Sequence, residues 1–232
     1  MIKENYETVC EKIREACKRA GRDESEVTLI SVSKTKPMED IAEAYEAGAR
    51  DFGENKVQEL VKKHDEGGLL DAKWHMIGHL QRNKVKDVVG RAVLIHSVDS
   101  FRLAEEINIQ GKKKGVTVPV LIELNVAEEE SKFGVSLSDA EDLISQISEN
   151  LSNVSVKGLM TVAPYVVDSE QNREIFHKIK DLSVDIAAKN YDNVSMDILS
   201  MGMTGDYEVA IEEGSTMVRV GTGIFGERNY KI

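Results

Sequence analysis

Short apolar runs alternate with longer amphipathic stretches along most of the chain. The apolar runs begin near residues 27, 50, 73, 92, 118, 154, 195 and 216, and several are rich in β-branched residues, as buried parallel strands are. Helical spacing of apolar residues separates them, over residues 38–47, 56–66, 82–88, 100–114, 136–149, 169–188 and 206–212. A charged amphipathic helix is predicted over residues 1–22. Ser100 and Ser138 stand where helix caps are expected.

Eight strand–helix alternations without a long linker predict a (β/α)₈ TIM barrel of the α/β class. We expect one domain over residues 1–232, with the N-terminal helix 1–22 packed on the barrel. An open doubly wound sheet is the alternative. The Gly-x-Gly-x-x-Gly fingerprint is missing after the first apolar run, which weakens the dinucleotide-binding form of that alternative.

Composition narrows the classes of partner. The chain has 232 residues, 41% of them hydrophobic, and its 30 basic and 41 acidic residues give a net charge of −11. That balance argues against a general nucleic-acid binder and against attachment to an anionic membrane. No apolar run approaches the ~20 residues that span a bilayer. With neither a signal sequence nor a disulfide pattern, we expect a cytoplasmic protein in which Cys10 and Cys17 are reduced packing residues.

Lys34 follows the first apolar run and precedes Pro37, which ends the strand. If its side chain points inward, the amine lies at the mouth of the core, where desolvation favours the neutral, nucleophilic form. Such a lysine can form a Schiff base with an aldehyde. The plainer interpretation is a lysine at a strand end that extends into water.

Polar residues and glycines gather at the ends of the seventh and eighth runs, in residues 199–206 and 219–226. Glycines let the backbone approach an anion, and Ser200, Thr204 and Thr222 can add hydroxyl donors. The loops after strands seven and eight are where such barrels most often hold phosphate. These segments therefore predict a phosphate site, although the same glycines could serve tight turns alone.

Arg219 lies between Val218 and Val220. The two-residue period of a strand places its side chain on the opposite face from the valines. A buried guanidinium needs an acceptor, either a carboxylate such as Glu123 or Asp197 or an atom of a ligand.

Two histidines stand near the end of the third apolar run. We expect His75 to be a satisfied core residue, and His79 to lie nearer the mouth. No third ligand accompanies them at a zinc spacing, so no metal site is predicted. The acidic run 128–130 is expected in a solvated loop.

The chain also resembles the pyridoxal phosphate homeostasis proteins, which look like the isolated barrel domain of alanine racemase. The resemblance covers almost the whole chain. Residues 32–37, 52–55, 58–59, 74–81, 158–161, 200–204, 218–222 and 224–226 carry it. One departure is Lys56, where many relatives have an aromatic residue, so no contact is carried over at that position.

The resemblance implies binding of pyridoxal 5′-phosphate (PLP), with Lys34 forming the Schiff base and Lys36 as a less favoured amine. It implies a phosphate site formed by Ser200, Gly221 and Thr222 with help from Thr204, Arg219 facing the pyridine nitrogen, and Asn55 and His79 bordering the ring.

The arginine in that position disfavours a proton on the ring nitrogen and so weakens the electron sink that catalysis needs. Alanine racemase takes its second base, a tyrosine, from a separate C-terminal domain of the partner subunit, and we expect no counterpart here. Tyr165 and Tyr207 are candidates that nothing in the sequence places.

Three functions remain open at this point. The first is a monomer that buffers PLP or delivers it to PLP-dependent apoenzymes, with no catalytic residues. The second is a weak PLP-dependent amino-acid racemase. The third is an aldolase-type barrel that uses Lys34 without a cofactor.

Overall fold

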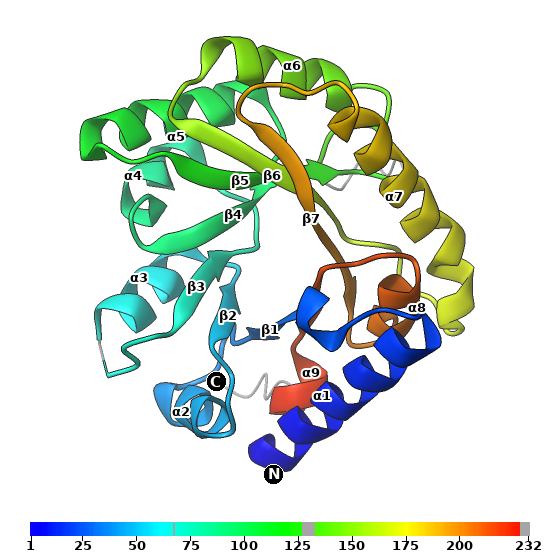
Figure 1. The fold of residues 1–232 in the computed structure, drawn as a ribbon. Helices are drawn as coiled ribbons and strands as arrows, with labels where there is room; N and C mark the ends of the chain where they lie inside the picture. Colours follow the sequence, from blue (N-terminus) through cyan, green and yellow to red (C-terminus); the bar gives the residue numbers. More distant parts are fainter. Residues whose placement is uncertain (67, 127–132, 228–232) are drawn as a thin grey trace.

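Eight parallel strands close into a barrel in the computed structural model, which describes residues 1–66, 68–126 and 133–227 (Figure 1). Each strand pairs with the next along the chain, and the last pairs with the first. The strands are Thr28–Val32 (β1), Asp51–Glu54 (β2), Lys73–Met76 (β3), Ala92–Val98 (β4), Val118–Leu124 (β5), Val154–Thr161 (β6), Val194–Met203 (β7) and Met217–Val220 (β8). The predicted α/β barrel is confirmed, and the open sheet is excluded.

Helices follow the strands and cover the outside of the barrel. They are Met38–Glu46 (α2), Val57–Asp65 (α3), Val85–Val88 (α4), Phe101–Lys114 (α5), Ala140–Asn150 (α6), Arg173–Ala187 (α7), Tyr207–Glu212 (α8) and Thr222–Phe225 (α9). Short 3₁₀ turns, Glu24–Glu26, Arg82–Lys84 and Ser169–Asn172, precede β1, α4 and α7. The predicted helices over residues 82–88 and 169–188 therefore each begin as a 3₁₀ turn.

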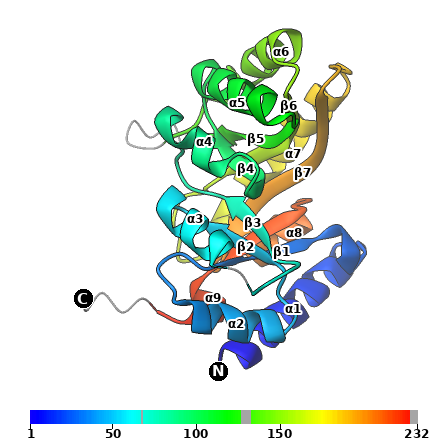
Figure 2. The ribbon, with the colours of Figure 1, turned by 90° about the vertical axis from the view of Figure 1, so that its left-hand side faces the viewer.

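The predicted N-terminal helix is present as Ile2–Arg19 (α1). In both ribbon views it lies beside α2, α8 and α9, so the start of the chain covers the segment that closes the barrel (Figures 1 and 2). Its buried face includes Val9, Ile13 and Cys17. Both cysteines are free thiols, Cys17 buried and Cys10 partly so, as expected for packing residues.

Alternation along the strands divides the core into two parts. In β5, Val120 and Ile122 pack outward beneath the helices, whereas Leu121 packs inside the barrel with Leu94 and Met160. The same two-residue period directs Glu123 toward the interior. The barrel interior is thus filled with side chains, as in other barrels of this kind, and its upper layer is polar.

The predicted helix 136–149 is wrong at its start, because α6 begins at Ala140. Val135 is held in an extended bridge to Leu124. The Ser136 hydroxyl accepts the backbone N–H of Asp139 at 3.1 Å and donates to its carboxylate at 2.7 Å. Local bonds of this kind compete with the helix, and Ser138 consequently caps nothing.

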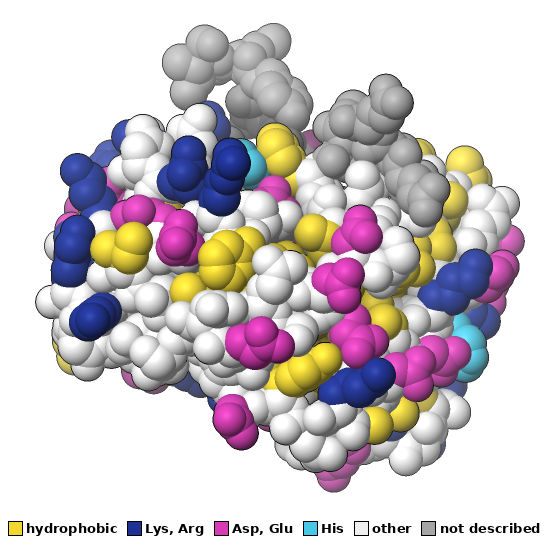
Figure 3. Space-filling model, turned by 90° about the horizontal axis from the view of Figure 1, so that it is seen from above, with side chains coloured by type: hydrophobic (Ala, Val, Ile, Leu, Met, Phe, Trp, Pro, Cys, Tyr) yellow, Lys and Arg dark blue, Asp and Glu magenta, His cyan; other side chains and the backbone are white. Residues whose placement is uncertain are grey.

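The acidic run 128–130 lies outside the described residues. On the face shown in Figure 3, acidic side chains are spread across the whole width, whereas the lysines and arginines gather mainly toward the left. Within the described part of the chain, no helix has the length and apolar character needed to cross a membrane.

Candidate functional site

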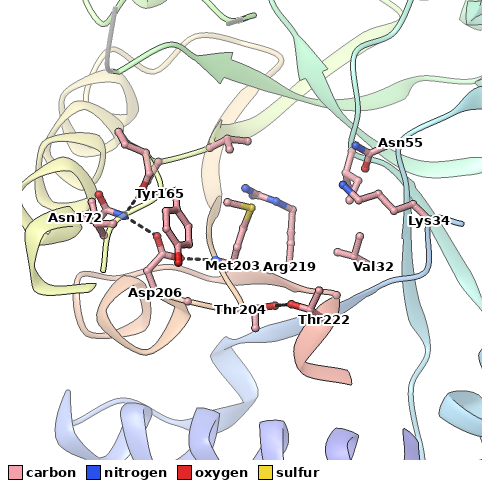
Figure 4. A pocket seen from close by; sticks show the side chains of 17 residues that line it. Val32, Lys34, Asn55, Tyr165, Asn172, Met203, Thr204, Asp206, Arg219 and Thr222 are labelled. Carbon is pink, nitrogen blue, oxygen red and sulfur yellow. Dashed lines mark hydrogen bonds between the residues drawn. The ribbon is translucent and has the colours of Figure 1, made fainter. Parts of the chain in front are cut away.

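A cavity of about 720 Å³ opens among the carboxyl ends of the strands. That size falls within the ~300–1,000 Å³ of small-molecule sites. In Figure 4, Lys34 extends from the end of β1 toward the guanidinium of Arg219, and Thr204 and Thr222 lie together below it. The cavity combines six residues that the sequence singled out with walls that are largely apolar. These six residues are Lys34, Asn55, Thr204, Arg219, Gly221 and Thr222.

The backbone on the N-terminal side of Lys34 is held by a buried cluster. Ser33 donates its hydroxyl to Glu54 at the end of β2, and its carbonyl accepts a hydrogen bond from the Lys63 ammonium at 2.8 Å. Lys63 also pairs with Glu54 at 2.8 Å, with their side chains 7% and 0% exposed. This ion pair fixes the end of β1 from beneath.

The backbone on the other side of Lys34 is held as well. The Thr35 N–H donates to the Glu59 carboxylate at 2.7 Å, and Glu59 in turn lies 3.3 Å from the Lys63 ammonium. Thr35 has a φ of 65°, the left-handed region that non-glycine residues rarely adopt. The bonds to its neighbours over-determine this conformation and direct Lys34 into the cavity.

Lys36, the competing amine, is engaged elsewhere. Its ammonium donates to the Phe225 carbonyl at 2.8 Å, and Lys36 is not among the residues that line the cavity. The geometry therefore favours Lys34 as the amine that meets a ligand.

Arg219 forms part of the cavity floor and is 4% exposed. One of its nitrogens, Nη1, donates to the Ser200 carbonyl at 2.7 Å and to the Ser200 hydroxyl at 2.6 Å, and Nη2 donates to the Thr161 carbonyl at 2.6 Å. Burial lowers the pKa of Arg219 to about 10, so it stays charged at neutral pH.

The carboxylates considered as partners of Arg219 take other positions. Asp197 is exposed. Glu123 is close enough to interact electrostatically with Arg219, but its buried Oε2 accepts no hydrogen bond from the described residues. Burial raises the pKa of Glu123 to about 7, and Asp99 adds to the rise while Arg219 opposes it.

Two hydroxyls and two glycines meet at the edge of the cavity. The Thr222 hydroxyl lies 3.3 Å from that of Thr204, and Gly205 and Gly221 present bare backbone beside them. A side chain added at Gly205 would meet nothing within 4 Å. This set of small groups and hydroxyl donors suits the oxygens of an anion.

Asp206 and Asn172 shape that edge, and the sequence did not single them out. Asp206 Oδ1 accepts the Met203 N–H at 2.7 Å, and Oδ2 accepts a hydrogen bond from the Asn172 amide at 2.8 Å. The same amide donates to the Pro164 carbonyl at 3.0 Å and so ties together the loops after β6 and β7. The sequence could have pointed to Asp206, because it ends the polar segment 199–206, but no pattern pointed to Asn172.

Ser200 and His79 do not line the cavity. Ser200 lies within β7 and is fully buried beneath the floor, because the strand runs on to Met203. The imidazole of His79 stacks on Phe133 with ring centroids 3.7 Å apart, and its Nδ1 is 3.8 Å from an oxygen of Asp99. Both remain predicted ligands that no direct geometry supports.

Gly78 explains how Asn55 reaches the cavity. A Cβ at Gly78 would lie 2.5 Å from the Asn55 carbonyl oxygen, so only glycine lets the two loops approach this closely.

The structure also places the histidine and the two tyrosines that the sequence analysis considered, His75, Tyr165 and Tyr207. His75 is 2% exposed and hydrogen-bonded, which confirms it as a satisfied core residue. Tyr165 lines the cavity at its rim and is 95% exposed, whereas Tyr207 is buried against other elements and does not line it. The described residues contain no group of three or more His, Cys, Asp or Glu side chains placed to hold a metal ion.

Comparisons with known proteins extend over nearly the whole chain. The sequence model of the family described as alanine racemase, N-terminal domain, matches residues 5–229. A pyridoxal phosphate homeostasis protein of Aquifex aeolicus (strain VF5) is 48% identical over 227 residues, which cover 98% of each chain. The protein of that name in Escherichia coli (strain K12) is 41% identical over 233 residues, 99% of this chain and 97% of its own.

Solved structures agree with this picture. PipY of Synechococcus elongatus PCC7942, solved with PLP bound, has a TM-score of 0.83 at 33% identity and covers 97% of this chain and 100% of its own. Alanine racemase of Clostridium difficile 630 has a TM-score of 0.75 at 14% identity, covering 98% of this chain and 58% of that one, so it shares the fold. The chain therefore belongs to the alanine racemase N-terminal domain family and groups there with the pyridoxal phosphate homeostasis proteins.

Proposed function

We propose that this chain binds PLP in the cavity, with Lys34 forming a Schiff base to its aldehyde, and that it holds the cofactor for buffering or delivery. One observation carries the proposal: an amine, a buried guanidinium and a pair of hydroxyls line a single cavity. The names of the relatives and the PLP complex of PipY support the choice of ligand.

The donor set fits the chemical groups of PLP. Thr204, Thr222 and the backbone at Gly205 and Gly221 suit the phosphate, and Lys34 suits the aldehyde. Apolar neighbours such as Val32 provide surface for a ring. Ser200 belongs to this site through its bonds to Arg219 rather than through the cavity wall.

Two groups of the cavity support holding without turnover. Bound PLP supplies an aldehyde that condenses with amines and a ring that can delocalise a carbanion. Arg219 keeps a positive charge at the floor, and this charge opposes protonation of a nearby ring nitrogen. Tyr165 lines the rim of the cavity and is almost fully exposed, so the surrounding protein does not hold it in the way that a positioned general base is held.

We propose further that the protein acts as a cytoplasmic monomer whose recipients are PLP-dependent apoenzymes. A racemase of low activity and an aldolase-type barrel without a cofactor are the outcomes against which this is tested.

The test is reduction of the PLP-loaded protein with borohydride, followed by peptide mapping. We expect one modified lysine, Lys34, and no modification in Lys34→Ala. The matched control, Lys36→Ala, removes an amine of the same loop that is tied to Phe225 and should load normally. Failure of the wild-type chain to take up PLP would contradict the proposal.

A second measurement separates holding from catalysis. The loaded protein is incubated with D- and L-amino acids, and racemisation is followed against Lys34→Ala. We expect rates far below the ~1 per second at which ordinary enzymes begin. A Lys34-dependent rate at or above that value would establish the racemase instead.

A further inference from the structure

A line of polar side chains crosses the interior of the barrel from its base to the cavity floor. Asp51 starts it at the first residue of β2, and His75 follows, with its Nε2 2.9 Å from Asp51 Oδ1. His75 Nδ1 lies 3.0 Å from His96 Nε2, and His96 Nδ1 lies 3.0 Å from the Ser200 hydroxyl. Ser200 accepts a hydrogen bond from Arg219, so the line ends at the cavity.

Burial makes every bond of this line matter. The side chains of His75, His96 and Ser200 are at most 2% exposed, and that of Asp51 is 16% exposed. Leu94, on the same face of β4 as His96, packs in the apolar layer of the interior. A polar group that loses its partner in such surroundings costs about 1–3 kcal/mol.

The two ends of the line fix the direction of its protons. Arg219 can only donate, so the Ser200 oxygen accepts a hydrogen bond from its Nη1, and the Asp51 carboxylate can only accept, so His75 Nε2 donates to it. With both rings neutral, a proton on His75 Nε2 leaves His75 Nδ1 as an acceptor for His96, and the Ser200 hydroxyl then donates to the unprotonated His96 Nδ1. His96 Nε2–H donates to His75 Nδ1, and His75 Nε2–H donates to the Asp51 carboxylate.

A neutral His96 is consistent with that direction. Its complete burial, with His75 and Arg219 nearby, holds its pKa well below the ordinary value. Each imidazole then has one donor and one acceptor, and each is satisfied by one neighbour.

We propose that Asp51, His75 and His96 are positioning residues of the cofactor site, which hold Ser200 and Arg219 through a hydrogen-bond chain of fixed direction. Asp51 lies at the opposite end of the barrel from the cavity, so the chain makes the base of the barrel part of the site. The role rests on the proposed PLP binding, whereas the direction of the chain can be tested without any ligand.

The direction is tested by long-range ¹H–¹⁵N correlation of the imidazoles in the cofactor-free protein, about two pH units above the ordinary histidine pKa of ~6.5. We expect both His75 and His96 to carry their single proton on Nε2. A proton on Nδ1 of either ring would overturn the proposal.

The effect on the site is tested by titration with PLP. Ser200→Ala removes the link between His96 and Arg219, and its matched control is Ser97→Ala, which deletes a buried hydroxyl of β4 that has no hydrogen-bond partner among the described residues. We expect Ser200→Ala to bind PLP about tenfold more weakly than Ser97→Ala, since a hydrogen bond to a charged group contributes at least ~1.4 kcal/mol. Equal affinities would overturn the proposal.

Substitutions at Asp51, the end of the hydrogen-bond chain farthest from the cavity, test whether the hydrogen bonds rather than packing affect PLP affinity. Asp51→Leu removes the acceptor for His75, whereas Asp51→Asn keeps an oxygen in its place. We expect at least about threefold weaker PLP binding in Asp51→Leu and recovery of most of that loss in Asp51→Asn. Equal losses of PLP affinity in Asp51→Leu and Asp51→Asn would contradict the positioning role of the hydrogen-bond chain.

Failure of the proposed function is distinguishable from failure of this inference. A wild-type protein that does not bind PLP refutes the function, and the Nε2 protonation of both histidines is still measurable there. A wild-type protein that binds PLP as tightly as Ser200→Ala refutes the positioning role alone. Thermal melts of all variants show whether each is folded before its titration is interpreted.

Discussion

Glu123 should make the free energy of unfolding depend on pH in a way that one substitution removes. Its carboxyl group is buried in the polar upper layer of the barrel interior, and burial raises its pKa to about 7, against 4.5 for the ordinary group. Glu123→Gln keeps the size of the side chain and removes the titration. The perturbation therefore isolates the cost of ionising one buried carboxyl group.

The sign follows from the direction of the shift. A group whose pKa is raised in the folded state favours folding below its unfolded pKa, and that contribution is lost as the pH rises through the folded pKa. For a shift from 4.5 to about 7, the wild-type protein loses about 2 kcal/mol of stability between about pH 5.5 and 8 relative to Glu123→Gln.

The assay is denaturant unfolding followed by circular dichroism at several pH values between 5.5 and 8. The stability of Glu123→Gln relative to wild type should rise steadily across this range. Glu105→Gln, at an exposed position of α5, is the control and should show no such trend. A difference between wild type and Glu123→Gln that is independent of pH, or that falls as the pH rises, would refute the assignment of a raised pKa.

Two further substitutions test the packing around the site. Lys63→Met leaves the fully buried carboxylate of Glu54 without its cation and should cost about 3–5 kcal/mol, measured by denaturant midpoint, whereas Lys62→Met, at a side chain that is 73% exposed, should change stability by less than about 0.5 kcal/mol. Similar losses in both would show that the ion pair is unimportant. Gly158→Ala places a Cβ 1.7 Å from the Ile198 carbonyl oxygen at a φ of +152°, and it should cost at least about 3 kcal/mol. Gly115→Ala, at a φ of +68° with nothing within 4 Å, should cost only about 1–2 kcal/mol, and a comparable loss at both glycines would contradict the steric argument.

The periodicity of the chain was enough to predict the barrel, because parallel strands buried on both faces have a distinctive apolar pattern. It also placed Arg219 on the opposite face of its strand from Val218 and Val220, and the structure packs those two valines in the core beneath the helices. It could not predict that β7 continues past Ser200, because polar residues at a strand end look the same as the start of a loop.

The buried ion pair of Lys63 could have been predicted from the sequence, because a lysine occurs at an apolar position of a helix. Lys63 lies on the apolar face of α3, three residues after Leu60 and six after Val57, where a charged residue needs a buried partner. No sequence pattern indicated the series of hydrogen bonds that runs from His75 to Arg219. Its distances depend on the register between β3 and β4, which shifts at His75, and local sequence does not encode that register.

The hydrogen bonds that hold the backbone on both sides of Lys34 have an entropic consequence for any ligand that binds this amine. Ordering a loop residue costs about 1–2 kcal/mol of backbone entropy, and a site on a loose loop loses that amount from its affinity at each binding event. Here Ser33 and Thr35 are already fixed by Glu54, Glu59 and Lys63 when the chain folds. The backbone entropy of these residues is therefore lost on folding, and binding at Lys34 involves no further loss from ordering them.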